Sequence, residues 1–267
     1  MLTPARDAAP AAWIVDSLHG FAADAGSVVP PVFEAYVRVF HPAQLRGRPV
    51  TWTEIARASG RQVHPAMQFH ALVPAGSVDE AGNRRAPQPD LWDDVPRPGS
   101  LDRDIVERLL PILHAHTKTP ERCWFAFWDG WGIPVALVAR KGPVARFFGA
   151  RKRAGVPDHR VRERWQAPTF SIPGRILLLF AGALDDALEG FYDPYGNDVF
   201  QSAYFWWPDD RAWCVATEID LMSTYIGASD ACAEAILRAP AIEAMRASVE
   251  DQITASADKI NPDPFAG

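Results

Sequence analysis

The sequence has few cysteines and lacks a long apolar run. Its three cysteines, Cys123, Cys214 and Cys232, are widely spaced and form no Cys-x-x-Cys pair. This excludes a disulfide framework and argues against a thiol redox site or a zinc knuckle. The longest strongly apolar stretch, residues 176–184, is less than half as long as the roughly twenty residues of a membrane helix. Residues 1–12 contain no continuous apolar segment, so no signal peptide is predicted. These features predict buried, reduced thiols in a cytoplasmic protein.

Several motifs that mark enzyme families are also absent. The chain contains no Gly-x-Ser-x-Gly, no Gly-x-x-x-x-Gly-Lys-Ser/Thr, no Gly-x-Gly-x-x-Gly and no His-Glu-x-x-His. Their absence disfavours acyl transfer and P-loop chemistry, and no cofactor-binding motif is left. His114 and His116 are two residues apart, so on a helix their side chains diverge. We therefore predict neither a metal site nor a cofactor.

The charge balance is acidic, with 27 Lys and Arg against 33 Asp and Glu and a net charge of −6. This balance argues against nonspecific binding of nucleic acid by the whole molecule. The exception is the segment 140–164, where nine basic residues occur with two acidic ones and Arg146 precedes two phenylalanines. Interleaved arginine and aromatic residues suit single-stranded nucleic acid. We favour the simpler interpretation, a solvated loop or a contact for an acidic protein.

The composition is that of a folded protein, with 48% hydrophobic and 11% aromatic residues. A chain of 267 residues is long enough to bury a large core without metal or disulfides. Clusters of proline and glycine predict loops at 74–99 and 140–164. We expect one domain over residues 31–255, preceded by a frayed leader at 1–30 and followed by a tail at 256–267.

Hydrophobic patterning predicts both strands and helices. Strands are predicted at 32–40, 67–73, 122–128, 133–138 and 175–181. Helices are predicted at 51–58, from Ser100 to about residue 113, and at 229–238, with Pro111 kinking or shortening the second one. The fold class is therefore α+β, with a mainly antiparallel sheet of about five to seven strands flanked by a few helices.

The clearest hairpin signal lies between residues 203 and 219. With Asp209 and Asp210 at the tip, Trp206 pairs with Trp213 and Phe205 pairs with Cys214. One face then carries Tyr204, Trp206, Trp213 and Val215. The other face carries Phe205, Trp207, Ala212, Cys214 and Ala216.

Three stretches of sequence resemble a family of uncharacterised actinobacterial proteins. They are residues 123–132 (CWFAFWDGWG), 206–220 (WWPDDRAWCVATEID) and 223–229 (STYIGAS). The resemblance covers roughly residues 101–240, and the family implies no activity that can be transferred. The order of a helix, a Trp-rich strand, a hairpin and a closing helix is also similar to the SUKH superfamily, which includes immunity proteins against bacterial toxins. This second resemblance implies an immunity-like role by fold analogy.

Tryptophans beside the two turns suggest a binding surface. Six of the ten tryptophans lie around the two predicted hairpins. Mid-strand tryptophans are expected in the core, whereas those beside turns have about equal odds of being partly exposed. A partly exposed indole offers a large contact area and one N–H donor. The candidate binding residues are Trp128, Asp129, Trp131, Trp207, Asp209, Asp210 and Arg211.

Two carboxylates suggest an alternative. Glu218 and Asp220 are two residues apart at the end of a predicted strand, which places their side chains about 6–7 Å apart on one face. That separation suits a glycosidase-like pair or a site for a hard metal ion, although the sequence offers no pattern for a third metal ligand. The simpler interpretation is a charged strand end, and Arg211 is expected to pair with one of the nearby acids.

The leading hypothesis is an intracellular binding or interaction module, immunity-like, that uses the aromatic hairpin tips and the basic loop. Its partner would be another protein or a small ligand, with nucleic acid as an option only through residues 140–164 and with no membrane. The alternative is a small hydrolase in which Glu218 and Asp220 are catalytic residues beside an aromatic cleft.

Overall fold

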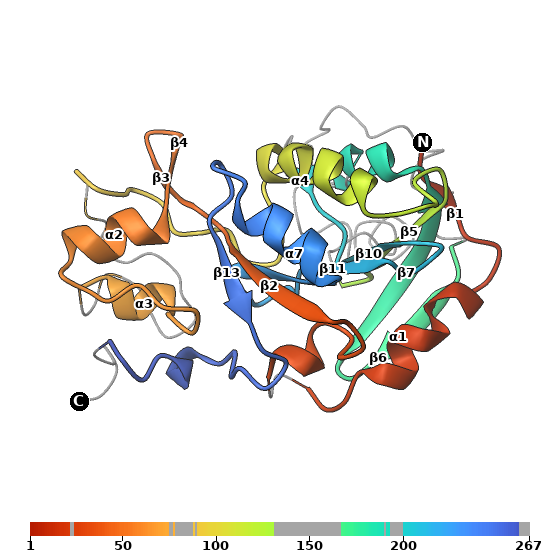
Figure 1. Cartoon of the computed structure of the whole chain (residues 1–267), viewed down its shortest axis with the longest axis horizontal. Coiled ribbons are helices and arrows are strands. Elements are labelled where there is room, and N and C mark those ends of the chain that lie inside the picture. The colour runs from red at the N-terminus through yellow and green to blue at the C-terminus, as the bar shows by residue number, and fades with distance from the viewer. Residues whose placement is uncertain are drawn as a thin grey trace, which may run out of the picture.

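The computed structural model describes residues 1–21, 24–74, 77, 88, 90–130, 167–189, 191–192 and 200–261. The strands of its main sheet are β1 (Thr3–Pro4), β2 (Ala35–Phe40), β5 (Cys123–Trp128), β6 (Thr169–Ile172), β7 (Arg175–Gly182), β10 (Phe205–Pro208), β11 (Trp213–Ala216), β12 (Ser223–Ala228) and β13 (Ala244–Ala247). Their order is β1-β7-β5-β10-β11-β12-β2-β13, with β6 also paired to β7 (Figure 1). All these pairings are antiparallel.

The helices are α1 (Ala12–Ser17), α2 (Trp52–Ala58), α3 (Phe69–Leu72), α4 (Arg103–Ala115) and α7 (Asp230–Leu237). Two small hairpins join β3 (Ala43–Leu45) to β4 (Arg48–Val50) and β8 (Phe191–Tyr192) to β9 (Phe200–Gln201). The predicted α+β class with a mainly antiparallel sheet is confirmed. The described residues contribute nine strands to that sheet rather than five to seven, because β1, β6 and β13 add to its margins.

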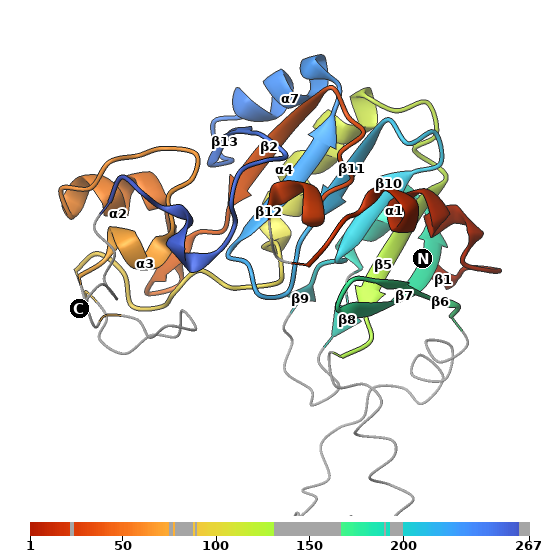
Figure 2. The same ribbon diagram turned by 90° about the horizontal axis from the view of Figure 1, so that it is seen from below.

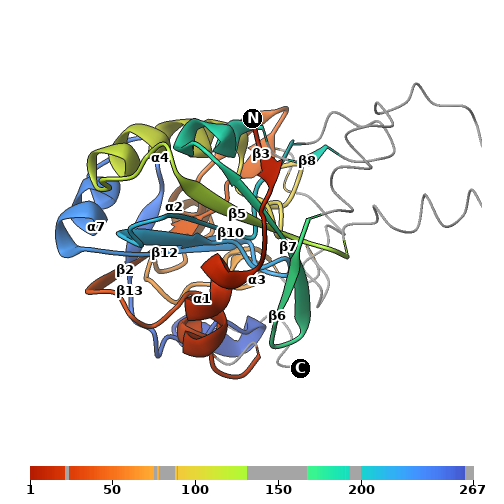
Figure 3. The same cartoon turned by 90° about the vertical axis from the view of Figure 1, so that its right-hand side faces the viewer.

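Both faces of the sheet are covered. Helices α4 and α7 pack on one face, and α1 with residues 5–11 before it packs on the other (Figure 3). β5 lies between β7 and β10. Its side chains alternate, so that Phe125 enters the core under α4 and Ala126 enters the opposite core. A strand covered on both faces carries apolar residues at every position, as predicted for residues 122–128.

The helix ends follow the expected capping chemistry. Thr51 accepts the N–H of Glu54 and begins α2 with a capping box, and Ser229 accepts the N–H of Cys232 to begin α7. α4 continues through Pro111 and begins after Asp102 instead of Ser100. The described residues contain no helix whose length and apolar character would allow it to span a bilayer.

The hairpin of β10 and β11 has a different register from the predicted one. Trp206 lies opposite Val215 and Phe205 lies opposite Ala216. Each partner on β11 is therefore two residues later than predicted, because the loop contains residues 209–212 and not only the Asp209–Asp210 pair. A shift of two residues in the strand register keeps each side chain on the same face of the sheet. The rings of Trp206 and Trp213 therefore still meet, with centroids 5.5 Å apart.

The predicted faces are correct for the paired residues of this hairpin. Tyr204 and Ala212 are the exceptions, since Tyr204 joins the core beneath α1 and Ala212 packs against the core under α4. Both lie just outside the strands, where the pleat no longer determines the direction of a side chain.

A separate lobe follows β2 at one end of the sheet. It contains the β3–β4 hairpin, α2 and α3, around a core that includes Trp52, Phe69 and Trp92. The predicted strand at 67–73 is wrong, because residues 69–72 form α3. Alternating apolar residues occur in short helices as well as in strands, and four residues are too few to distinguish them.

The first and last described segments of the chain are integrated into the fold. The predicted frayed leader at 1–30 is wrong, because β1 pairs with β7 and Ile14 is fully buried. The predicted tail is wrong for residues 256–261, where Asp258 and Asn261 are buried. The predicted strand at 133–138 and the basic loop at 140–164 lie outside the described residues, as does half of the predicted loop at 74–99.

Candidate functional site

The predicted site residues separate into two groups at opposite ends of the sheet. β5 and β10 are antiparallel, with Cys123 opposite Pro208, so the loop at 209–212 lies beside the start of β5. Trp128 lies at the other end of β5, opposite Leu177. The expected single surface made of both hairpin tips is therefore not formed.

The first group, at the 209–212 loop, is exposed and largely engaged with its own neighbours. Asp210 accepts hydrogen bonds from the N–H of Lys118 at 2.7 Å and the hydroxyl of Thr117 at 2.8 Å. Asp209 accepts the indole N–H of Trp124 at 3.2 Å. The guanidinium of Arg211 lies over the Trp13 ring, 5.4 Å from its centroid, instead of forming the expected pair with a nearby acid in the described residues.

Of the three tryptophans expected to be partly exposed, one is confirmed as such. Trp128 is half-buried, and Asp129 follows it in an intermediate position. Trp207 is 1% exposed, so the expectation for that ring is wrong. It faces inward because it belongs to the β10 face beneath α1, where it contacts Trp13. Trp131 lies outside the described residues.

The second group joins Trp128 to the two predicted catalytic carboxylates through an arginine. Nη2 of Arg175 lies 2.6 Å from Oε1 of Glu218 and 2.7 Å from Oδ2 of Asp220. Nε of the same arginine donates to Oε1 of Glu218 at 3.0 Å. The guanidinium also lies over two rings, 5.0 Å from the centroid of Phe21 and 5.6 Å from that of Trp128. One cation is thus held by two carboxylates and two aromatic faces.

Burial differs sharply between the two carboxylates. The side chains of Arg175 and Glu218 are 11% and 10% exposed, whereas that of Asp220 is 72% exposed. Burial raises the pKa of the Glu218 carboxyl, against the hydrogen bond from the Asp220 N–H and the charge of Arg175. Burial also raises the pKa of the Tyr204 hydroxyl, and Glu218 adds to this effect. Glu218 and Tyr204 therefore form a desolvated polar edge, with Asp220 at the solvent side.

The turn that carries these carboxylates is fixed from several sides. Glu218 and Asp220 lie after the end of β11 and not on the strand as predicted, and the Asp220 N–H donates to Oε2 of Glu218 at 2.6 Å. Gly99 donates its N–H to the Leu221 carbonyl and has φ +69°. A Cβ at Gly99 would lie 2.5 Å from the Ile219 carbonyl oxygen. Only glycine fits both this backbone conformation and this close approach.

A cavity of about 270 Å³ lies beside the turn. Its apolar wall includes Trp52, Phe69 and Ile253, and its polar edge includes Tyr204, Glu218 and Asp220. Three separate parts of the chain therefore form it, namely the sheet end, the lobe and the last described segment. Arg175 is not part of the lining. Among the described lining residues, Glu218 and Asp220 are the only acidic side chains, and none of the others is Lys or Arg.

A second and larger cavity, about 530 Å³, lies between the β3–β4 hairpin and the start of α4. Several of its charged groups already serve the fold. Arg97 donates to Phe200 and Gln201, Arg103 donates to Glu107, and Glu243 accepts the first N–H groups of α2. These charges hold the walls together, so this cavity is a weaker candidate for a site.

The thiols and the possible metal ligands do not form a site. All three cysteines are buried and unpaired, as predicted, and burial raises the pKa of Cys123 to about 12 and that of Cys232 to about 11. Within the described part of the chain, no three His, Cys, Asp or Glu side chains are grouped so that they could hold a metal ion.

Comparison with protein-family models, curated proteins and solved structures finds no match to this chain. The resemblance to an actinobacterial family and to the SUKH superfamily therefore stays a prediction.

The sequence pattern predicted the two carboxylates of this site but gave no prediction of a role there for Arg175, Tyr204 or Phe21. Arg175 follows Gly174 at the start of β7, a position that gives no sign of its partners 43 and 45 residues away. One indirect sign of this role was present in the sequence, because Arg175 is a charged residue at the end of a strand that is otherwise apolar.

Proposed function

We propose that this protein is a binding module for a small organic ligand with an apolar body and a positively charged or hydrogen-bond-donating group. The observation that carries the proposal is the cavity of about 270 Å³, which has an aromatic and aliphatic wall and a carboxylate edge. Small-molecule sites commonly combine a mostly apolar concave surface with a few convergent polar groups.

The electrostatics of the edge favour a cation or a donor over an anion. Glu218 and Asp220 together carry one more charge than Arg175 neutralises, and Arg175 itself does not line the cavity. Oδ2 of Asp220 accepts a hydrogen bond from Arg175, and the Asp220 side chain is largely exposed to solvent beside the cavity. An amine at this edge would also lie near the aromatic rings of Tyr204 and Phe21, which line the same cavity.

The same geometry supports binding more than hydrolysis. A glycosidase needs its scissile bond between an acid and a second carboxylate. Here the Arg175 guanidinium occupies the space between Glu218 and Asp220, and both oxygens of Glu218 already accept hydrogen bonds. The hydrolase alternative rests on one observation, that both carboxylates line a cavity.

A titration with matched probes tests the proposal. Phenethylamine, phenethyl alcohol and phenylacetate share one ring and differ in charge, so each is added to the full-length protein while amide NMR shifts are recorded. We expect saturable shifts near residues 218–222 and 253–255, with the amine binding most tightly and phenylacetate most weakly.

A cavity-filling variant provides the control. Leu221 is half-buried and lines the cavity, whereas Leu237 is half-buried on α7 and does not. Leu221→Trp is expected to abolish the shifts and Leu237→Trp to preserve them. No saturable shift for any of the three probes, or equal binding by both variants, would contradict the proposal. Release of nitrophenol from a panel of nitrophenyl glycosides, lost in Glu218→Gln, would instead support the hydrolase.

A further inference from the structure

The last described segment of the chain forms one wall of the cavity. We call residues 248–261 the C-terminal strap. Ile253, Thr254 and Ala255 of the strap line the cavity, and Figure 2 shows this dark blue segment beside α3. Thr254 and Ala255 are also exposed to solvent. At these residues a single layer of chain therefore separates the cavity from the surrounding water.

The first attachment of the strap is made of backbone hydrogen bonds and buried apolar surface. Gly26 donates its N–H to the Val249 carbonyl at 2.8 Å, and Ala25 donates to the Asp251 carbonyl at 2.9 Å. Ile253, just beyond, is 4% exposed and belongs to the core beneath α1. This end is tied to the body of the protein in the manner of an edge strand.

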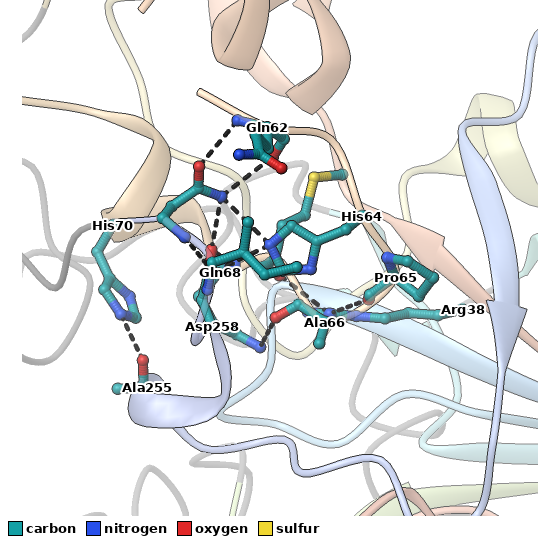
Figure 4. A network of polar contacts seen from close by, with 12 residues as sticks. Arg38, Gln62, His64, Pro65, Ala66, Gln68, His70, Ala255 and Asp258 are labelled. Carbon is teal, nitrogen blue, oxygen red and sulfur yellow. Dashed lines mark hydrogen bonds and ion pairs between the residues drawn. The ribbon is translucent and has the colours of Figure 1, made fainter. Parts of the chain in front are cut away.

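The second attachment depends on side chains and is centred on Asp258 (Figure 4). Its carboxylate accepts hydrogen bonds from Nε2 of His64 at 2.9 Å and from the N–H of Gln68 at 3.3 Å. Asn261 adds two bonds to the same segment, since its side chain accepts the Gln62 N–H at 2.8 Å and donates to the Gln62 carbonyl at 3.0 Å. We call these contacts of Asp258 and Asn261 with residues 62–68 the latch.

Asp258 also organises the strap itself. It accepts the N–H groups of Ile260 and Asn261 and the side-chain amide of Asn261. Although burial alone raises the pKa of this carboxyl, the hydrogen bonds from Asn261 and Ile260 and the nearby His64 lower it overall. Asp258 is therefore ionised at neutral pH. Removing its charge weakens five hydrogen bonds together, whereas no comparable single residue holds the first attachment.

Between the two attachments, residues 254–256 are exposed. His70 contacts the Ala255 carbonyl through Nε2 at 2.7 Å, which adds one tie from the lobe. Segments with exposed backbone and few buried apolar contacts open locally at lower free energy than the core. An opening of the latch alone leaves residues 249–253 in place as a hinge.

We propose that the C-terminal strap is a movable wall of the cavity, hinged at residues 249–253 and latched by Asp258, and that opening of the latch gives ligands a second route of exchange beside the solvent-exposed side at Asp220. The exchange step rests on the proposed binding function. The movement of the strap does not, so the two are tested by separate measurements.

The movement is measured by the reactivity of a new thiol inside the cavity. Val28 lines the cavity and is 2% exposed, and the three native thiols are buried with a raised pKa. The rate at which methyl methanethiosulfonate labels Val28→Cys is followed by mass spectrometry, alone and combined with Asp258→Asn. We expect Asp258→Asn to make the labelling about tenfold faster. Losing a hydrogen bond to a charged group shifts the equilibrium between the closed and the open strap by about this factor.

Asp210→Asn is the matched control, because Asp210 also accepts several hydrogen bonds but lies at the far end of the sheet. It is expected to leave the labelling rate of Val28→Cys unchanged. If Asp258→Asn prevents folding, Asn261→Ala breaks only part of the latch and is expected to give a smaller acceleration. Hydrogen exchange at residues 254–257 is expected to follow the same order of variants.

Equal labelling rates with and without the latch substitutions, or an equal effect of Asp210→Asn, overturn the inference. Faster labelling in a protein that binds none of the phenethyl probes supports the movable strap and contradicts the proposed function. Unchanged labelling together with saturable phenethylamine binding contradicts the strap and leaves the proposed function standing.

Discussion

At one end of the sheet, Arg175 joins Glu218 and Asp220 with a guanidinium that is 11% exposed, whereas at the other end Arg122 meets Asp209 with side chains 69% and 39% exposed. Both contacts are ion pairs of 3.1 Å or less. They differ in how much water is excluded, and exclusion of water determines how strongly the fold depends on each pair. The buried pair lies beside a cavity, and the exposed pair lies on a loop that is held by its own hydrogen bonds.

The largest expected effect comes from breaking each pair. Arg175→Met leaves Glu218 buried without its cation and is expected to lower the free energy of unfolding by about 3–5 kcal/mol. Arg122→Met is expected to cost about 0–1 kcal/mol. Urea denaturation of both variants measures the difference. Similar losses of unfolding free energy in the two variants would mean that the burial of an ion pair does not determine its contribution to stability.

A smaller effect is expected from pH at the cavity end, through His41. Its Nδ1 lies 2.7 Å from the Arg97 carbonyl, which can only accept, so Nδ1 carries the proton and Nε2 accepts from the Thr224 hydroxyl at 2.9 Å. Burial lowers the pKa of His41 from 6.5 to about 4. The folded state therefore keeps the neutral ring, while the unfolded state binds a proton below about pH 6.5.

Stability from His41 is thus fully present above pH 6.5 and is lost as the pH falls toward 4, by about 3 kcal/mol in total. Unfolding free energies measured by urea between pH 7 and 4 test this. His41→Gln is expected to flatten the dependence of the unfolding free energy on pH in that window. At the other end, hydrogen bonds from Lys118 and its neighbours lower the pKa of Asp210 despite partial burial, so its contribution is lost only at more acidic pH. A slope that is the same with and without His41 would contradict this assignment.

A third effect separates two glycines with positive φ. Gly99→Ala is expected to lower the free energy of unfolding by about 1–3 kcal/mol, because its Cβ meets the Ile219 carbonyl on the carboxylate turn. Gly60 has φ +65° with no atom within 4 Å of a new Cβ. Gly60→Ala is therefore expected to cost about 1 kcal/mol from backbone conformation alone. Thermal or urea unfolding checks the pair, and equal losses would show that contact with the turn is unimportant.

The smallest effect is expected at the exposed end. Arg211→Ala removes a cation from the Trp13 ring and is expected to change the free energy of unfolding by about 0.5–1 kcal/mol, without changing binding of the phenethyl probes. Denaturation together with the NMR titration measures both properties. A loss of probe binding in this variant would mean that the two ends of the sheet are coupled.

Local patterns in the sequence predicted the elements whose signals are local. Thr51 and Ser229 lie at the starts of helices where the capping residues are expected, and the apolar run at residues 122–128 became a strand covered on both faces. The hairpin register was missed by two residues because Asp210 binds residues 117 and 118, a long-range contact that lengthens the loop. The integration of residues 1–30 was missed for a similar reason, since β1 pairs with β7 almost 180 residues later.

The candidate site was only half predictable. Glu218 and Asp220 stood out because two acids follow an apolar strand, but Arg175 and the lobe that completes the cavity are distant in sequence. Trp207 showed the opposite problem. A tryptophan next to a turn was expected to be partly exposed, yet the pleat of β10 directs it into the core and the helix α1, assigned to the leader, covers it.

The pairing of residues 24–26 with residues 249–252 has a consequence for biosynthesis. A ribosome adds roughly 5–20 residues each second, so the early segment waits more than ten seconds for its partner. During translation the central strands can associate first, whereas the pocket stays open on the side that the last residues will close. A nascent chain therefore closes this side of the pocket only after residues 249–255 have left the exit tunnel of the ribosome.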